Sequence, residues 1–360
     1  MKKRTGFFKA FPPPAYLSMP AVGLDISDLS IKFAELKYHK GALRLERYGY
    51  QAIPAGAIEN GEVKKSRPVI EALKKLREKH GLYRVVISLP EEQAYVVRMS
   101  LPLVSNKELR QSIELQLEEY VPLSGNNIVF DYQVIRRVPG GKGRVDVSVS
   151  VLPAELVKNY YYVLEKAGWQ PLAFEIEAHS LARSLLGPDT EGVSLIVGIG
   201  KTRTSFAVVE GTKVSFTSTV DSVGGMYVTE NIAQKLNISF EEAEKLKIAK
   251  GLLRSSDNAD VFEVIIASAS VLRDEIGNIL KYWRSHQPLD SQAVSQIILC
   301  NGESTLLGLD NYLASNISLP VKIGDPWRNI LSVDETVPAL SFYDSLRYST
   351  ALGLALRAVN

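Results

Sequence analysis

One strand-turn-strand pattern occurs twice in this sequence, first over residues 22–36 and again over residues 195–209. In each copy an apolar strand runs into a tight turn of small and hydroxyl residues, and a second strand leaves that turn. Backbone N–H and hydroxyl groups at such a turn face outward and form a concave site for an anion. Two copies in one chain predict two similar lobes that hold one phosphate chain between them.

The overall composition is that of an ordinary globular protein, and 360 residues are enough for two lobes. A net charge of +2 gives no reason to expect nucleic-acid binding. The longest apolar runs, such as Val193–Ile199, are far shorter than the roughly 20 residues that span a bilayer. The single cysteine, Cys300, fits a reducing compartment. We therefore expect a cytoplasmic protein without a transmembrane helix.

Strand and helix signals alternate along the chain, which predicts an α/β fold. Within this pattern, residues 93–171 read as a small α+β unit. Ser105 and Glu108 have the spacing of a capping box, and the alternating valines of 145–151 indicate a half-buried strand. Other strands are expected at 43–50, 84–89, 95–101, 128–135, 213–220 and 297–300, and helices at 67–80, 105–120, 153–166, 176–186, 261–284, 305–314 and 350–358.

Short segments spread over most of the chain share the order and spacing of one known family. They are Arg98–Pro102, Glu108–Pro122, Phe130–Val134, Ala167–Trp169, Glu175–Ala178, Glu242–Lys247, Asp274–Ile276 and Ala351–Arg357. On these segments the chain resembles the PilM family of type IV pilus assembly proteins. That family belongs to the actin-like ATPase superfamily and is similar to the bacterial division protein FtsA.

The resemblance implies an actin-like two-lobed α/β fold, with duplicated strand-turn-strand phosphate loops and an inserted small α+β subdomain. The expected parts are a basic and aromatic leader (1–20), a first lobe (21–92 with 172–190 and 340–360), the inserted subdomain (93–171), and a second lobe (191–339) with a helical subdomain at about 224–290. The leader is either a disordered tail or a segment that touches a membrane or a partner.

In function, the resemblance implies a cytoplasmic scaffold at the inner face of the cytoplasmic membrane, in a pilus, secretion or DNA-uptake machine. Its expected partners are the cytoplasmic N-terminal tail of PilN, other platform and motor components, and further copies of itself, with membrane association through partners. The tail would lie in a groove beside the inserted subdomain, around Leu117, Tyr120, Val121 and Phe130. Each of these side chains could instead belong to the core.

The first phosphate loop matches the family in part. Asp25, Ser30 and Lys32 stand at the family positions. Asp28 replaces a hydroxyl residue, which would place a carboxylate where a polyphosphate lies and oppose its binding. A second interpretation of Asp25 is a carboxylate that caps its own turn.

The second loop departs further, because Gly198 stands where the superfamily has an aspartate that holds the water shell of the metal. Gly200 and Thr202 can still donate hydrogen bonds to phosphate. Lys201 or Arg203 could neutralise phosphate charge without a metal, or could be solvated charges of a hairpin.

Three further sets of residues match the family's nucleotide site. Gly224 and Gly225 allow close approach at a helix N-terminus, where anions bind. Glu244 and Lys247 match residues near the ribose and base, or form a surface ion pair. Gly302 matches the adenosine turn. The implied cofactor is ATP with Mg²⁺ at a degenerate site.

Glu177 matches the water-positioning acid of the superfamily and is a weak candidate for a catalytic residue. Without the aspartate at Gly198, we expect weak or absent ATP hydrolysis. The histidines are scattered, so no metal-ligand set is predicted. The alternatives are an active actin-like ATPase and an FtsA-like membrane-associated filament former.

Overall fold

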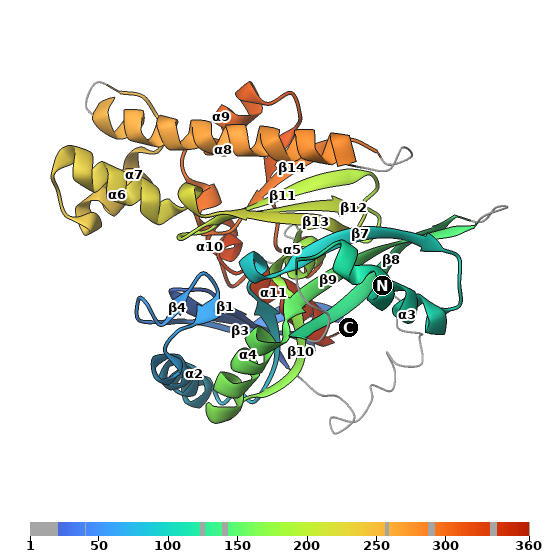
Figure 1. Cartoon of the computed structure of the whole chain (residues 1–360). Coiled ribbons are helices and arrows are strands. Elements are labelled where there is room, and N and C mark those ends of the chain that lie inside the picture. The colour runs from blue at the N-terminus through green and yellow to red at the C-terminus, as the bar shows by residue number, and fades with distance from the viewer. Residues whose placement is uncertain are drawn as a thin grey trace.

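The computed structural model describes residues 21–39, 41–122, 127–138, 143–255, 259–286, 292–331 and 337–359. The expected leader, residues 1–20, lies outside these residues. Two five-stranded sheets form the centres of two lobes, and a three-stranded sheet stands beside them (Figure 1). No helix of the described residues has the length and apolar character that crossing a membrane requires.

The two large sheets have corresponding topologies, as the duplicated pattern predicts. The first has the order β10-β6-β1-β2-β3 and the second the order β13-β12-β11-β14-β15. In each lobe the first strand of the motif, β1 or β11, pairs antiparallel with the next strand and parallel with a later one. The strands are β1 Val22–Ile26, β2 Ser30–His39, β3 Ala42–Ala52, β6 Arg84–Leu89, β10 Gln170–Ile176, β11 Val193–Ile199, β12 Thr204–Glu210, β13 Lys213–Val220, β14 Val294–Cys300 and β15 Val321–Ile323.

The helices α5 (Glu177–Leu185) and α11 (Ser349–Val359) lie between the two sheets (Figure 1). Apolar side chains of α5, such as Leu181, belong to a core that includes Leu24 of the first sheet and Ile196 of the second. The two lobes therefore share one hydrophobic core, and burial of its apolar surface holds them together.

The remaining helices cover the outer faces. The long helix α8 (Ala259–His286) and α9 (Leu309–Asn316) pack on the second sheet. The first half of α8 also packs with α6 (Gly225–Leu236) and α7 (Phe240–Lys250) in a small helical cluster. The other elements are β4 Ile58–Glu59, β5 Glu62–Val63, α2 Ser66–His80, α4 Ala154–Lys166 and α10 Phe342–Leu346.

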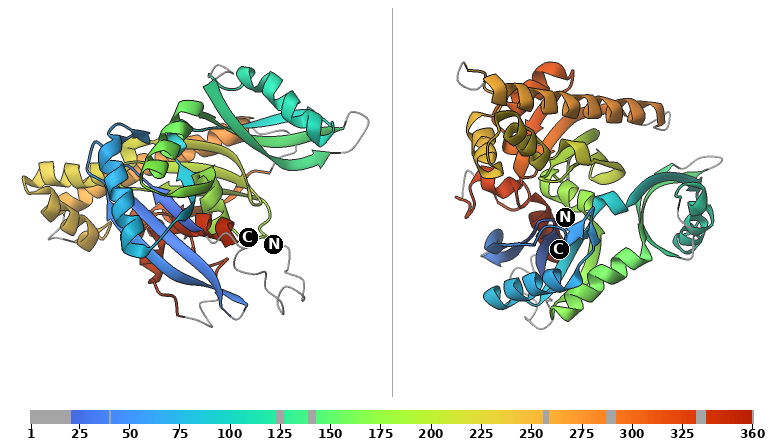
Figure 2. Two further views of the ribbon diagram at one scale, coloured as in Figure 1. Left: turned by 90° about the horizontal axis from the view of Figure 1, so that it is seen from below. Right: turned by 60° about the vertical axis from the view of Figure 1, so that its left-hand side comes forward.

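The three-stranded sheet has the order β7-β9-β8, and α3 covers one of its faces (Figure 2). Its elements are β7 Tyr95–Pro102, α3 Asn106–Gln116, β8 Ile128–Val138 and β9 Arg144–Pro153. The predicted capping box of Ser105 and Glu108 is confirmed. Alternating apolar residues of β9 face α3, which explains the period of two in this segment.

Two expected helices differ from the structure. We placed α4 in the inserted unit, but its buried side chains, among them Tyr160 and Leu164, pack in the core of the first lobe. The helix expected over 305–314 begins only at Leu309, after a single 3₁₀ turn. Gly308 has φ +79°, a left-handed conformation that interrupts the helix.

Helices α5 and α11 approach each other more closely than side chains would allow. At Gly353 of α11, an added Cβ would overlap the backbone of Ser180 in α5. The glycine therefore fixes the distance between these helices. At Gly277 in α8, by contrast, an added Cβ would have no other atom within 4 Å.

We expect Gly353→Ala to lower the free energy of unfolding by roughly 1–3 kcal/mol or more, because the new methyl group has no room. Gly277→Ala is the matched control and should raise it by about 0.5–1 kcal/mol, because alanine favours a helix. Urea unfolding of both variants measures the two changes. Equal effects would contradict the close approach.

Candidate functional site

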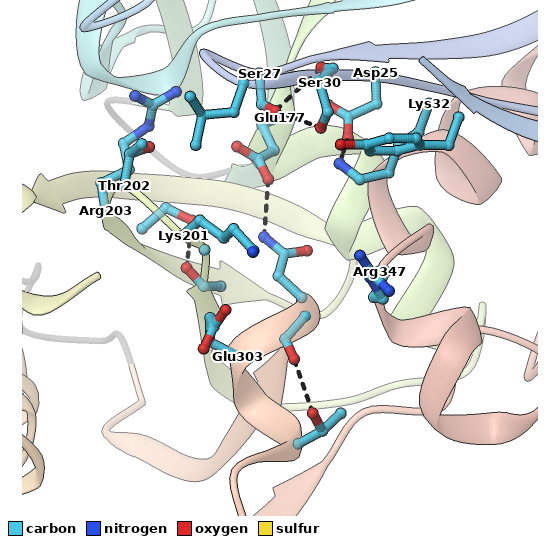
Figure 3. A pocket seen from close by; sticks show the side chains of 18 of the residues that line it. Asp25, Ser27, Ser30, Lys32, Glu177, Lys201, Thr202, Arg203, Glu303 and Arg347 are labelled. Atoms are coloured by element: carbon cyan, nitrogen blue, oxygen red, sulfur yellow. Dashed lines mark hydrogen bonds and ion pairs between the residues drawn. The ribbon is translucent and has the colours of Figure 1, made fainter. Parts of the chain in front are cut away.

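A cavity of about 530 Å³ lies between the lobes, where the two strand-turn-strand turns face each other (Figure 3). It brings together most of the residues that the sequence predicts for a nucleotide site. Those that line it are Asp25, Ser30, Lys32, Glu177, Gly200, Thr202, Glu244, Lys247 and Gly302. Gly224 and Gly225 are not among the lining residues.

Hydroxyl groups hold the first turn, between β1 and β2. The Ser27 hydroxyl donates to the Ser30 carbonyl (3.1 Å) and contacts the Ser30 hydroxyl (3.0 Å). Asp25 instead accepts from Lys32 (3.2 Å) and from Ser88 (3.4 Å). The turn therefore does not depend on the Asp25 carboxylate, whose charge is already balanced by Lys32.

Asp28 does not lie in the phosphate bed, and this part of the prediction is wrong. Its side chain is buried and turned away from the cavity. It accepts hydrogen bonds from the Gly61 N–H (3.2 Å) and the Arg203 guanidinium (3.1 Å). The sequence could not show this, because Arg203 comes from the other lobe.

Arg203 joins the two lobes. Its side chain is 13% exposed, and Nη1 lies 3.1 Å from Asp28 and 2.6 Å from Glu92. Arg203 is therefore not a solvated hairpin charge. Lys201 on the same turn is 51% exposed and lies 3.6 Å from Glu244, which is a loose contact near the surface.

Three glutamates, Glu91, Glu92 and Glu177, have raised pKa values. Burial raises the pKa of Glu91 and of Glu92 to about 7. Burial and the nearby Asp25 also raise the pKa of Glu177, which accepts hydrogen bonds from Asn301 and Thr350 at 3.1 Å each. Sequence analysis missed Glu91 and Glu92. The sequence did contain a signal for them, because two acidic residues that follow so soon after the buried strand β6 are expected at the end of the sheet, where the site lies.

Lys247 is buried rather than part of a surface ion pair. Its ammonium group contacts Glu244 and Glu303 at 2.9 Å each and donates to the Gly225 carbonyl (3.0 Å). An ammonium has three donors, so these contacts use all of them. A ribose hydroxyl could reach Lys247 only by replacing one of them.

The N-terminus of α6 is also occupied by the protein itself. The N–H groups of Gly225 and Met226 donate to the carbonyls of Gly200 and Lys201 (3.0 and 2.8 Å). A side chain at Gly224 would meet the second turn at 2.6 Å. Gly224 therefore lets α6 pack against this turn, and Gly225 leaves room for the Glu303 side chain. The N–H groups of Gly225 and Met226 are not open to an anion.

The residues present do not fit the metal arrangement of the superfamily. Gly198 supplies no carboxylate, and an added Cβ would lie 2.6 Å from the Ser205 hydroxyl and 3.0 Å from the Asn301 amide, so these two side chains would have to move to admit an aspartate. Within the described residues, no three His, Cys, Asp or Glu side chains form a group that could hold a metal ion. Asp25 already faces Lys32.

Two sheets of corresponding topology around one cavity define an actin-like protein. This class is supported by a structure of MreB5 of Spiroplasma citri bound to ADP, which has a TM-score of 0.55 at 12% identity and covers 94% of this chain and 95% of that one. The family model for type IV pilus assembly protein PilM matches residues 23–359. The chain therefore belongs to the PilM family, which confirms the resemblance seen in the sequence.

Two further relatives agree with this assignment. A structure of a PilM-PilN type IV pilus biogenesis complex has a TM-score of 0.78 at 22% identity, and covers 95% of this chain and 99% of that chain. The cell division protein FtsA of Enterococcus hirae is 24% identical over 255 residues, which are 64% of this chain. The match spans 57% of the length of that FtsA.

The buried glutamates predict a fall in stability as the pH rises. Between about pH 4.5 and pH 7, Glu91 and Glu92 keep their protons in the folded chain and lose them in the unfolded chain. Unfolding therefore releases protons in this range, and the free energy of unfolding falls as the pH rises. Glu91→Gln should reduce this fall in the free energy of unfolding by on the order of 1.4 kcal/mol for each unit by which folding raises the pKa of Glu91. Urea unfolding at pH 5 and pH 8 measures it.

The exposed Glu230, on α6, provides the matched control. Glu230→Gln makes the same chemical change at a side chain that is exposed to water. It should leave the pH dependence of the free energy of unfolding unchanged. The interpretation fails if Glu91→Gln and Glu230→Gln behave alike.

Proposed function

We propose that this chain is the actin-like scaffold of a type IV pilus or related machine, and that it binds the cytoplasmic N-terminal tail of a PilN-type protein at the inner face of the cytoplasmic membrane. A nucleotide in the interlobe cavity would stabilise its shape rather than be turned over. Contacts with other platform components and self-association are part of the same proposal. The observation that carries it is a second cavity beside the three-stranded sheet.

This second cavity has a volume of about 240 Å³. Gln133 of β8 lines it opposite His179 and Arg183 of α5, with Lys213 of β13 and Leu356 of α11 completing its walls. Within the described sheet, β8 pairs with β9 alone, so its outer edge has no strand partner. An extended peptide can add to such an edge and place side chains in a neighbouring pocket.

None of the four groove residues predicted from sequence lines this cavity. Leu117 and Val121 are buried in its core, which is the alternative that the sequence left open. Tyr120 is 44% exposed, and the Arg110 guanidinium lies 4.5 Å from the centre of the Phe130 ring. Tyr120 and Phe130 therefore remain candidates for a second contact of the tail.

Gln133→Lys should weaken binding of a synthetic PilN-type tail peptide by at least tenfold, because it adds a long cation beside Arg183 and Lys213. Calorimetric titration of the full chain measures this. Tyr120→Lys tests the other location, and Gln51→Lys on the edge strand β3 of the first lobe is the matched control. If only Tyr120→Lys loses binding, the tail binds around Tyr120 instead. If Gln133→Lys binds the peptide as the parent chain does, the second cavity is not the binding site.

An active ATPase is the second candidate, because the cavity lies where an actin-like fold holds nucleotide and Glu177 lines it. Asn301 and Thr350 both donate to Oε1 of Glu177, so only Oε2 is left to position an attacking water. An FtsA-like filament former is a third candidate, which rests on the family relation alone.

We expect no Mg²⁺-dependent release of phosphate above that of a heat-denatured sample, because Gly198 supplies no carboxylate and Asp25 is paired with Lys32. Glu177→Gln should change nothing in this assay. Turnover that requires Mg²⁺ and falls in Glu177→Gln would replace the scaffold proposal with the enzyme.

A further inference from the structure

We propose that the interlobe cavity binds a nucleoside polyphosphate without a divalent metal, and that Arg347 supplies the neutralising charge. This inference rests on the proposed function, because it assumes that the cavity takes a nucleotide. It assigns a ligand contact to Arg347, which was not among the site residues predicted from the sequence.

Arg347 directly follows α10 and lines the cavity opposite the second turn. A Cβ at Gly302 would lie 3.3 Å from its Cγ and 3.9 Å from its Nε, so the side chain extends along the face of this glycine. Figure 3 shows Arg347 pointing into the cavity. Because Gly302 has no side chain, the Arg347 side chain can extend past it toward the cavity.

Three other cations that line the cavity already pair closely with carboxylates. Lys32 pairs with Asp25, Arg203 with Asp28 and Glu92, and Lys247 with Glu244 and Glu303. Arg347 has no carboxylate within 4.0 Å among the described residues. Its five donors therefore remain available for a phosphate, which an arginine binds through two parallel hydrogen bonds.

Lys201 is the second cation with charge to offer. It is 51% exposed, and its contact with Glu244 is 3.6 Å long. Arg347 and Lys201 come from opposite sides of the cavity (Figure 3). A polyphosphate between them would gain charge-assisted hydrogen bonds at both ends without displacing a buried ion pair.

A magnesium ion has no equivalent place. Gly198 supplies no carboxylate, and a metal at Asp25 would displace Lys32. Mg²⁺ that arrives on the nucleotide also reduces the negative charge that Arg347 and Lys201 attract. Excess Mg²⁺ should therefore weaken binding, which is the reverse of what a metal-dependent site shows.

The test is calorimetric titration of the full chain with ATP, in EDTA and in excess Mg²⁺ at equal ionic strength. We expect binding in EDTA that becomes several-fold weaker in Mg²⁺. Arg347→Gln should weaken binding in EDTA by about tenfold or more, since it removes a charged hydrogen-bond donor. Arg347→Lys should keep part of the affinity, and adenosine should bind far more weakly than ATP.

Arg67→Gln on α2 is the matched control, because its side chain is 90% exposed and lies outside the cavity lining. Binding that requires Mg²⁺, or an Arg347→Gln variant that binds as the parent chain does, would overturn the inference and leave the nucleotide site standing. No ATP binding in either buffer would overturn both. The tail-peptide titration then decides independently whether the scaffold proposal survives.

Discussion

The ion pairs of Arg203 with Asp28 and Glu92 connect the two lobes at the centre of the molecule. This guanidinium pairs with both side chains, and its charge lowers the pKa values of Glu92 and Glu177 against the effect of burial. Removing one partner of such a group leaves an unpaired buried charge, at a cost of roughly 3–5 kcal/mol. The shared hydrophobic core holds the lobes together, and the positive charge of Arg203 offsets the cost of burying Asp28 and Glu92 between them.

Arg203 also changes what a nucleotide can contribute. The two turns face one cavity, and a phosphate chain between them would connect the lobes. Here the protein makes that connection itself, from the second turn to Asp28 on the first turn. A ligand shifts a conformational equilibrium only through different affinities for its states. With the lobes already joined, a bound nucleotide adds less to their connection, so we expect it to change the conformation of the chain only a little.

The sequence predicted the parts of the fold that depend on local patterns, and failed where distant residues meet. The duplicated motif and the helix α2 follow from periodicity alone. The pairing of Arg203 with Asp28, 175 positions apart, does not, and neither does the burial of Lys247. The family resemblance supplied the location of the site, but a match of residue types could not show which charges the protein neutralises internally.

The helix α5 links the two cavities. Glu177 at its start lines the interlobe cavity, and His179 and Arg183 line the second one. For a nucleotide to change the affinity for a peptide, α5 would need two positions with different contacts. Yet Ser180 in α5 lies against Gly353 with no space for a methyl group, and Arg183 is held by Glu175 and the Gly353 carbonyl. We therefore expect the nucleotide and the peptide to bind with little coupling, as suits a scaffold that stays in one conformation.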